Sequence, residues 1–121
     1  MLSVHDSSEL HLVKAVGNTL IEEGKATGTL PGTVSTRLDI NVEEGTATSS
    51  FTFHLRGGSL TGHASGSASP GRGGWESFSG TMLLTSGTGR FAHASGRGKM
   101  YGALYRRNDR LKVQTLGTLH Y

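Results

Sequence analysis

The chain has 121 residues with 19 glycines, two prolines and no cysteine, and it carries 12 basic and nine acidic side chains. The lack of cysteine excludes a disulfide scaffold and a thiolate metal site, and no apolar run approaches the length of about 18 residues that a membrane-spanning helix needs. Long helices are not expected either, because glycine, serine and threonine are poor helix-interior residues.

Alternation of apolar and polar residues, broken by short turn signals, runs through most of the chain. Residues 1–9 are predicted to form a flexible N-terminal arm, and residues 10–121 a single all-β domain. The expected strands are 10–16, 24–30, 34–42, 46–56, 59–69, 75–86, 98–107 and 111–121. Eight strands with hairpin-length connections indicate an antiparallel meander, which either closes into a barrel or remains an open sandwich. Periodicity alone does not separate these two arrangements.

The alternation also divides each strand into two faces. In the fourth strand Phe51 and Phe53 share a face, and His54 lies on the other. His54 and His63 are predicted to point outward. In the seventh strand one of two sets lines the interior, either Met100 with its alternate neighbours or Tyr101 with Tyr105, and the pattern leaves this choice open. Small residues share one side of two strands and would take volume away from a core, which could leave a cavity: Gly62, Ala64, Gly66, Ala68 and Gly102.

Residues 85–96, which read TSGTGRFAHASG, interrupt the alternation. A glycine turn and a short helical turn near residues 89–94 are predicted here, with Phe91 plugging one end of the sheet structure. The segment resembles the T-G-G-T-G-x-F-x-x-A-x-G stretch of plant allene oxide cyclases, dirigent proteins and small bacterial relatives. The strand, glycine turn and strand over residues 51–62 are similar to the part of that family that precedes the motif.

The resemblance implies an eight-stranded, up-and-down, calycin-like barrel with a pocket along its axis. It also implies a cofactor-independent cyclase or isomerase acting on a small lipophilic molecule, and a homodimer or homotrimer. The bacterial relatives include polyketide cyclases, which act mainly by folding a flexible substrate and therefore need few catalytic groups. His11 corresponds roughly to an acidic position on the first strand of the allene oxide cyclases.

Two residues are catalytic candidates, Glu22 and His11. Glu22 would face inward if Ala26 does, and a carboxyl group at the mouth of an apolar barrel can serve as general acid or base. Six residues are candidates for ligand contact: Trp75, Phe51, Phe53, Tyr101, Tyr105 and Met82. No histidine spacing typical of zinc sites occurs, so neither a metal nor another cofactor is expected.

Charge is distributed unevenly along the chain. Residues 1–53 contain three basic and seven acidic side chains, whereas residues 54–121 contain nine basic and two acidic ones. The basic residues between Arg90 and Lys112 allow an alternative hypothesis, a non-enzymatic module that binds a ligand or an anion through this basic face. A nucleic acid partner is not expected, because this region offers few aromatics for stacking and no recognised RNA or DNA motif. A membrane partner is not expected either, because no apolar run is long enough to span a bilayer. No signal peptide is recognised, so we expect a cytoplasmic or a mature secreted chain.

Overall fold

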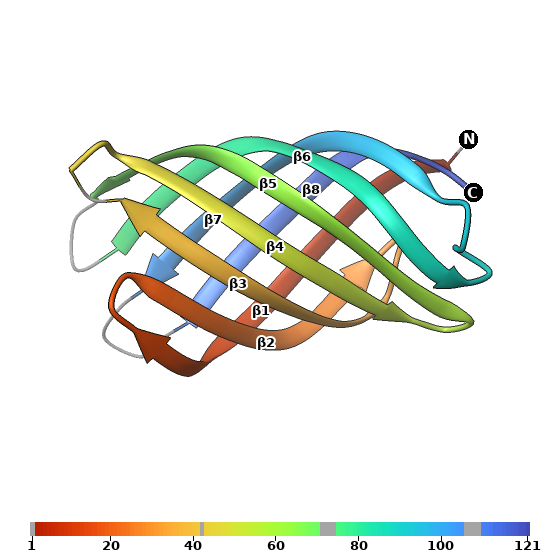
Figure 1. Ribbon diagram of the computed structural model, residues 1–121, viewed down its shortest axis with the longest axis horizontal. Helices are drawn as coiled ribbons and strands as arrows, with labels where there is room; N and C mark the ends of the chain where they lie inside the picture. Colours follow the sequence, from red (N-terminus) through yellow and green to blue (C-terminus); the bar gives the residue numbers. More distant parts are fainter. Residues whose placement is uncertain (1, 42, 71–74, 106–109) are drawn as a thin grey trace.

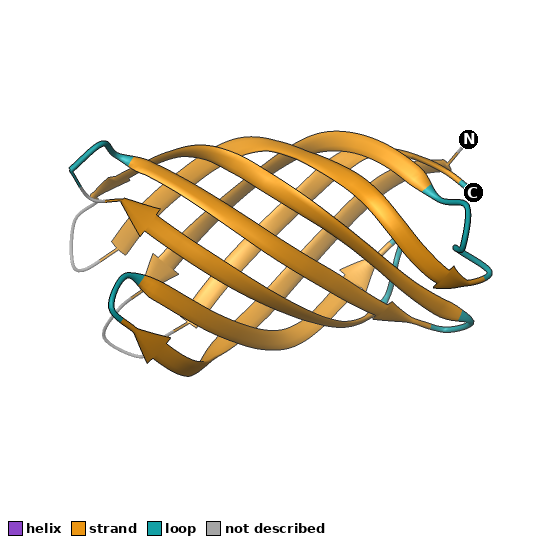
Figure 2. Ribbon diagram, in the orientation of Figure 1, coloured by secondary structure: helices purple, strands orange, loops and turns teal. Residues whose placement is uncertain are grey.

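The computed structural model describes residues 2–41, 43–70, 75–105 and 110–121, with the backbone alone at Pro70 and Trp75. These ranges form eight antiparallel strands that close into a barrel in the order of the sequence (Figures 1 and 2). The strands are β1 (Leu2–Val16), β2 (Thr19–Gly28), β3 (Gly32–Asn41), β4 (Thr46–Leu55), β5 (Gly58–Pro70), β6 (Trp75–Gly89), β7 (Ser95–Tyr105) and β8 (Arg110–His120). The predicted antiparallel barrel is thereby confirmed, and the open sandwich is excluded.

Closure depends on β1, which pairs with β8 from Leu2 opposite Leu119 to His11 opposite Arg110. The prediction of a flexible arm over residues 1–9 is therefore wrong for residues 2–9, which form the first half of β1. Their inward positions alternate as in the other strands, but two of them are polar, Asp6 and Ser8. Because these two inward residues are polar, the alternation of apolar and polar residues is weak in this segment. Pairing with β2 and β8 nevertheless makes it a strand.

Strand β2 also begins earlier than the sequence indicated, at Thr19 instead of residue 24. It follows a turn at Gly17, whose φ of 59° lies in the region that favours glycine. Both chain ends and the turns β2–β3, β4–β5 and β6–β7 lie at one end of the barrel (Figure 1). The loop predicted at residues 71–74 and the turn predicted at residues 106–109 lie outside the described residues.

Two aromatic rings fill space that glycines leave on neighbouring strands. A Cβ atom added to Gly102 would lie 2.3 Å from Cζ of Phe78, and one added to Gly62 would lie 2.9 Å from Cζ of Phe51. These two glycines therefore accommodate rings instead of leaving a void. Gly66 lies against backbone instead of a ring, because a Cβ atom there would lie 2.0 Å from the backbone oxygen of Ser79 on β6. Gly62 shares this constraint, with the Leu83 backbone oxygen at 2.4 Å. The strands approach so closely at this point that the inner surface tolerates no side chain.

Phe91 closes the barrel end near the chain termini and is only 3% exposed, as predicted. Its ring centroid lies 5.4 Å from that of Tyr121, and the Arg90 guanidinium lies over both rings at 5.1 and 5.3 Å. Successive hydrogen bonds from Phe91 N–H to Thr88 O and from Ala92 N–H to Gly89 O form a tight turn here. In the described residues this segment is a turn and not a helix, which corrects the expected short helical turn.

Candidate functional site

The barrel interior contains a cavity of about 50 Å³. Part of its wall consists of small residues on three adjacent strands, Ala47 on β4, Ala64 and Gly66 on β5, and Gly80 on β6. Gly66 and Gly80 lie directly opposite each other in the β5–β6 register. The cavity is therefore a consequence of small inward residues grouped on neighbouring strands, in a barrel whose eight strands leave little interior space.

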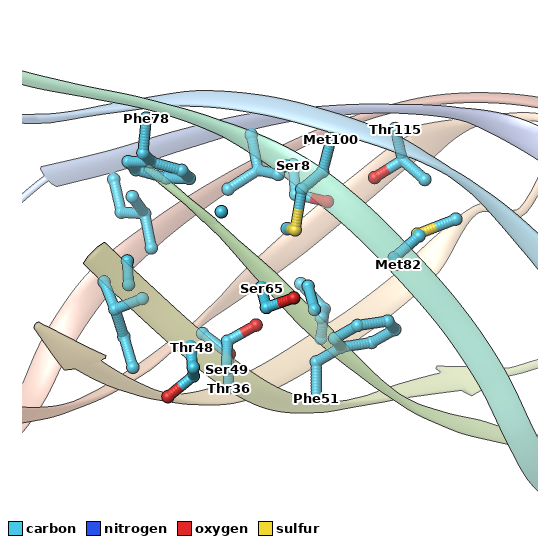
Figure 3. A pocket seen from close by; sticks show the side chains of 18 of the residues that line it. Ser8, Thr36, Thr48, Ser49, Phe51, Ser65, Phe78, Met82, Met100 and Thr115 are labelled. Atoms are coloured by element: carbon cyan, nitrogen blue, oxygen red, sulfur yellow. The ribbon is translucent and has the colours of Figure 1, made fainter. Parts of the chain in front are cut away.

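Apolar side chains make up most of the remaining wall (Figure 3). Phe51, Phe53 and Met82 line the cavity, as the sequence indicated for these three ligand-contact candidates. Phe78 and Met100 also contribute. Because thioether side chains are flexible and polarisable, the two methionines can adjust to the shape of an occupant more readily than branched residues can.

The polar atoms on the wall are hydroxyl groups. Ser8 and Thr115 are 6% and 3% exposed and lie on the adjacent strands β1 and β8 (Figure 3). The Thr36 hydroxyl donates to the backbone oxygen of Ser50 at 3.2 Å. The Oγ atom of Ser49 is buried and has no hydrogen-bond partner among the described residues. Ser49 therefore presents an unsatisfied hydroxyl group beside a mostly apolar space.

Asp6 is a second buried polar group, 1% exposed, next to Thr115 in the β1–β8 register. Its Oδ1 atom accepts a hydrogen bond of 2.8 Å from the backbone N–H of Leu30, whereas Oδ2 has no hydrogen-bond partner in the described ranges. Burial raises the pKa of Asp6 above its usual value of 3.8, although the backbone hydrogen bonds from Leu30 and Thr29 and the nearby His5 act in the opposite direction. Asp6 thus links β1 to the β2–β3 turn. Its burial favours the neutral carboxyl group more than solvent exposure would.

The two catalytic candidates lie on opposite faces of the barrel wall. Glu22 is inside and fully buried, opposite Leu12 on β1 and Thr36 on β3. His11 is exposed on the outer face of β1. The structure therefore does not bring Glu22 and His11 together. Glu22 is paired with Leu12, and His11, the residue before Leu12, points to the opposite face of β1. Glu22 is not among the described residues that line the cavity.

The sequence left open which face of β7 lines the interior. In the structure Met100 lines the cavity, while Tyr101 is 43% exposed on the outer surface. Tyr105 shares the outer face with Tyr101 because strand residues two apart lie on the same side. Neither tyrosine is among the described residues that line the cavity. The Trp75 backbone begins β6, and its side chain lies outside the described part of the structure. His54 and His63 are both exposed, as predicted.

Basic side chains do lie on the outer faces of β7 and β8, but two of the predicted set have local partners. Arg90 donates to the Tyr121 hydroxyl at 3.2 Å, and Arg110 lies 3.7 Å from a Glu9 carboxylate oxygen. Three exposed basic residues remain on these strands, Arg97, Lys99 and Lys112. Arg106 and Arg107 are outside the described residues. Within the described ranges no group of three histidine, aspartate or glutamate side chains is placed to hold a metal ion.

Four inward polar residues were not selected from the sequence: Asp6, Ser8, Ser49 and Thr115. The period of two could have placed Ser49 inward, because it lies two residues before Phe51. The same reasoning applies to Asp6 and Ser8 once residues 2–9 are recognised as a strand. Their polarity made them look like solvent-facing positions, since serine and aspartate are mostly exposed in proteins.

No family model, curated protein or solved structure matches the chain. No helix in the part of the chain that the structure describes is long and apolar enough to cross a membrane.

Proposed function

We propose that this barrel binds a small, largely apolar molecule in its interior cavity. The observation that carries the proposal is the mainly apolar wall around about 50 Å³ of space in the barrel interior, with an unsatisfied hydroxyl group on it. Pockets for small molecules typically combine a mainly apolar wall with a few polar groups that orient the ligand. Kinship with the allene oxide cyclase and dirigent barrels is part of this proposal, supported by residues 85–96 and by the closed eight-stranded architecture.

The size of the cavity limits what it can hold without rearrangement. Drug-sized ligands occupy pockets of about 300 to 1,000 Å³, and an engineered cavity of about 150 Å³ holds benzene. At about 50 Å³ this cavity accommodates a molecule of only a few carbon atoms. A five-membered ring is larger than this space, so it binds only if Met82, Met100 or Phe78 changes rotamer. The two methionines are best suited to do so, and the proposed binding includes this adjustment.

Thermal unfolding in the presence of cyclopentane tests the proposal. A ligand that binds only the folded state, at about ten times its Kd, stabilises the protein by about 1.4 kcal/mol, which raises the Tm by several degrees. The matched control is Ala64→Val, which adds two carbon atoms to the wall and should abolish the increase. The proposal fails if cyclopentane leaves the Tm of the wild-type protein unchanged up to its solubility limit.

Cofactor-independent cyclisation or isomerisation of the bound molecule is a second candidate function. Two carboxyl groups, Asp6 and Glu22, are buried in the same interior and favour it, but neither is among the described residues that line the cavity. Proton transfer therefore requires a bound molecule that extends beyond that lining. A buried carboxyl group can donate or accept a proton, and an enclosed cavity can hold the reacting atoms of a flexible substrate together. Any molecule extracted from the purified protein should then be converted by wild-type protein and converted more slowly by Glu22→Gln. Equal rates would leave Glu22 without a catalytic role.

Anion binding on the outer surface is a further candidate, favoured by Arg97, Lys99 and Lys112. These exposed side chains have no ion-pair partner in the described part of the chain, unlike Arg110. Salt-sensitive retention on heparin, lost in Arg97→Ala/Lys99→Ala, would support this function. Elution that is independent of salt would exclude it. The two tests are independent, because these residues and the cavity lie on opposite sides of the barrel wall.

A further inference from the structure

The cavity wall has one polar atom that is both buried and unsatisfied among the described residues lining it, the Oγ atom of Ser49. Ser49 lies on β4 between two inward positions, Ala47 and Phe51, and opposite Leu38 on β3 and Ala64 on β5. These four neighbours offer no side-chain oxygen or nitrogen. The hydroxyl group therefore has an unused hydrogen bond among apolar neighbours, which a ligand can satisfy.

Other hydroxyl groups near Ser49 do not share this state. The outward neighbour Ser50 has its Oγ atom 3.2 Å from Nδ1 of His63, and the Thr36 hydroxyl donates to the Ser50 backbone oxygen at 3.2 Å. The unused hydrogen bond is thus specific to the inward serine. It is not a general property of this serine- and threonine-rich sheet.

The wall also discriminates against ligand charge. No lysine, arginine or histidine is among the described residues that line the cavity. Two carboxyl groups, Asp6 and Glu22, are buried in the same barrel interior. A carboxylate ligand would lose its hydration without gaining a cationic partner, and such burial is strongly unfavourable. A pure hydrocarbon would fit the apolar wall but would leave the Ser49 hydroxyl unsatisfied.

We propose that the ligand is a neutral, mostly apolar molecule with a single hydrogen-bonding group, such as a ketone, alcohol or lactone, and that Ser49 selects it by donating or accepting that hydrogen bond. This inference rests on the proposed binding of an apolar molecule in the cavity. It adds the chemical class of the ligand and identifies a specificity-determining residue.

Three probes with the same ring test the inference: cyclopentane, cyclopentanone and cyclopentanecarboxylate at neutral pH. Their Kd values are measured by calorimetry for the wild-type protein, for Ser49→Ala and for the control Ser50→Ala. We expect Ser49→Ala to raise the Kd of cyclopentanone about tenfold, the worth of one hydrogen bond, and to leave the Kd of cyclopentane within about twofold. Ser50→Ala should change neither value, and cyclopentanecarboxylate should not bind.

The outcomes separate this inference from the proposed function. If cyclopentane and cyclopentanone both fail to bind to the wild-type protein, the cavity function and the inference fail together. If both bind and Ser49→Ala changes them equally, or if cyclopentanecarboxylate binds as tightly as the ketone, the inference alone is overturned. Ser49→Cys replaces the hydroxyl group by a somewhat larger thiol that donates only weakly. It should also weaken the binding of cyclopentanone more than that of cyclopentane. The test therefore still stands if Ser49→Ala does not fold.

Discussion

Replacing Ser49 by alanine should stabilise the ligand-free protein, although most substitutions in a protein interior destabilise it. The Ser49 hydroxyl group is buried without a hydrogen-bond partner among the described residues. An unsatisfied buried polar group of this kind costs about 1 to 3 kcal/mol. Removing the oxygen atom also enlarges the cavity by about 20 Å³, which costs about 0.5 kcal/mol at 24 cal/mol per Å³. The net expectation is a gain of about 1 kcal/mol, or about 4 °C in Tm for a chain of this size.

The assay is urea unfolding of protein that has been unfolded, dialysed and refolded, so that no small molecule remains bound. Ser50→Ala is the matched control, because Ser50 is the next residue on β4 and its exposed hydroxyl faces His63 outside the barrel. Its free energy of unfolding should change by less than about 0.5 kcal/mol. A loss of stability in Ser49→Ala alone would refute the reasoning, because it would show that the Ser49 hydroxyl is satisfied within the fold.

Four further substitutions test how the fold is held together. Gly66→Ala should destabilise the protein by about 3 kcal/mol, because its Cβ atom would lie 2.0 Å from the Ser79 backbone oxygen; Gly17→Ala, where φ is 59° and nothing lies within 4 Å, should cost only about 1 kcal/mol. Equal losses of stability in the two variants, measured by urea unfolding, would contradict the close approach of β5 and β6. Asp6→Asn keeps an acceptor for the Leu30 N–H. Because burial raises the pKa of Asp6, the wild-type protein should be most stable below the unfolded-state pKa and lose stability as the pH rises through the folded-state value. The stability of the variant relative to wild type should therefore increase from about pH 4 to about pH 7, and the opposite slope would show that the pKa is lowered. Arg90→Ala removes the guanidinium above the rings of Phe91 and Tyr121 and should lower stability by about 0.5 to 1 kcal/mol; an unchanged Tm would show that this contact does not stabilise the barrel end.

The sequence predicted most of the fold because its main signal, the period of two, is local. Turns at Gly45 and Gly57, where φ is 66° and 92°, and the inward face of Phe51 and Phe53 followed directly from it. The start of β1 did not follow, because its inward positions include the polar residues Asp6 and Ser8, which resemble solvent-facing positions in the sequence. Pairing with β2 and β8 places them inside. The pairing of β1 with β8 joins residues at opposite ends of the chain. A pattern within a short stretch of sequence does not indicate such a pairing.

The site was less predictable than the fold, because a cavity is a difference between the space enclosed and the volume of the side chains. Small residues such as Gly62 and Gly102 were expected to leave space, but rings from neighbouring strands occupy it. Ala64 and Gly66 do line the cavity. Which glycine is covered by a ring depends on the cross-strand register, and the register follows from pairing of the whole barrel.

Methyl NMR of Met82 and Met100 reports directly on whether a ligand enters the barrel, because both side chains line the cavity. With methionine methyl groups labelled by carbon-13, cyclopentanone is titrated into the wild-type protein and into Ala64→Val. Binding inside the barrel should give saturable shifts of both methyl resonances in the wild-type protein and none in the variant. Resonances that do not move in the wild-type protein, or that move equally in both proteins, would contradict binding inside the barrel.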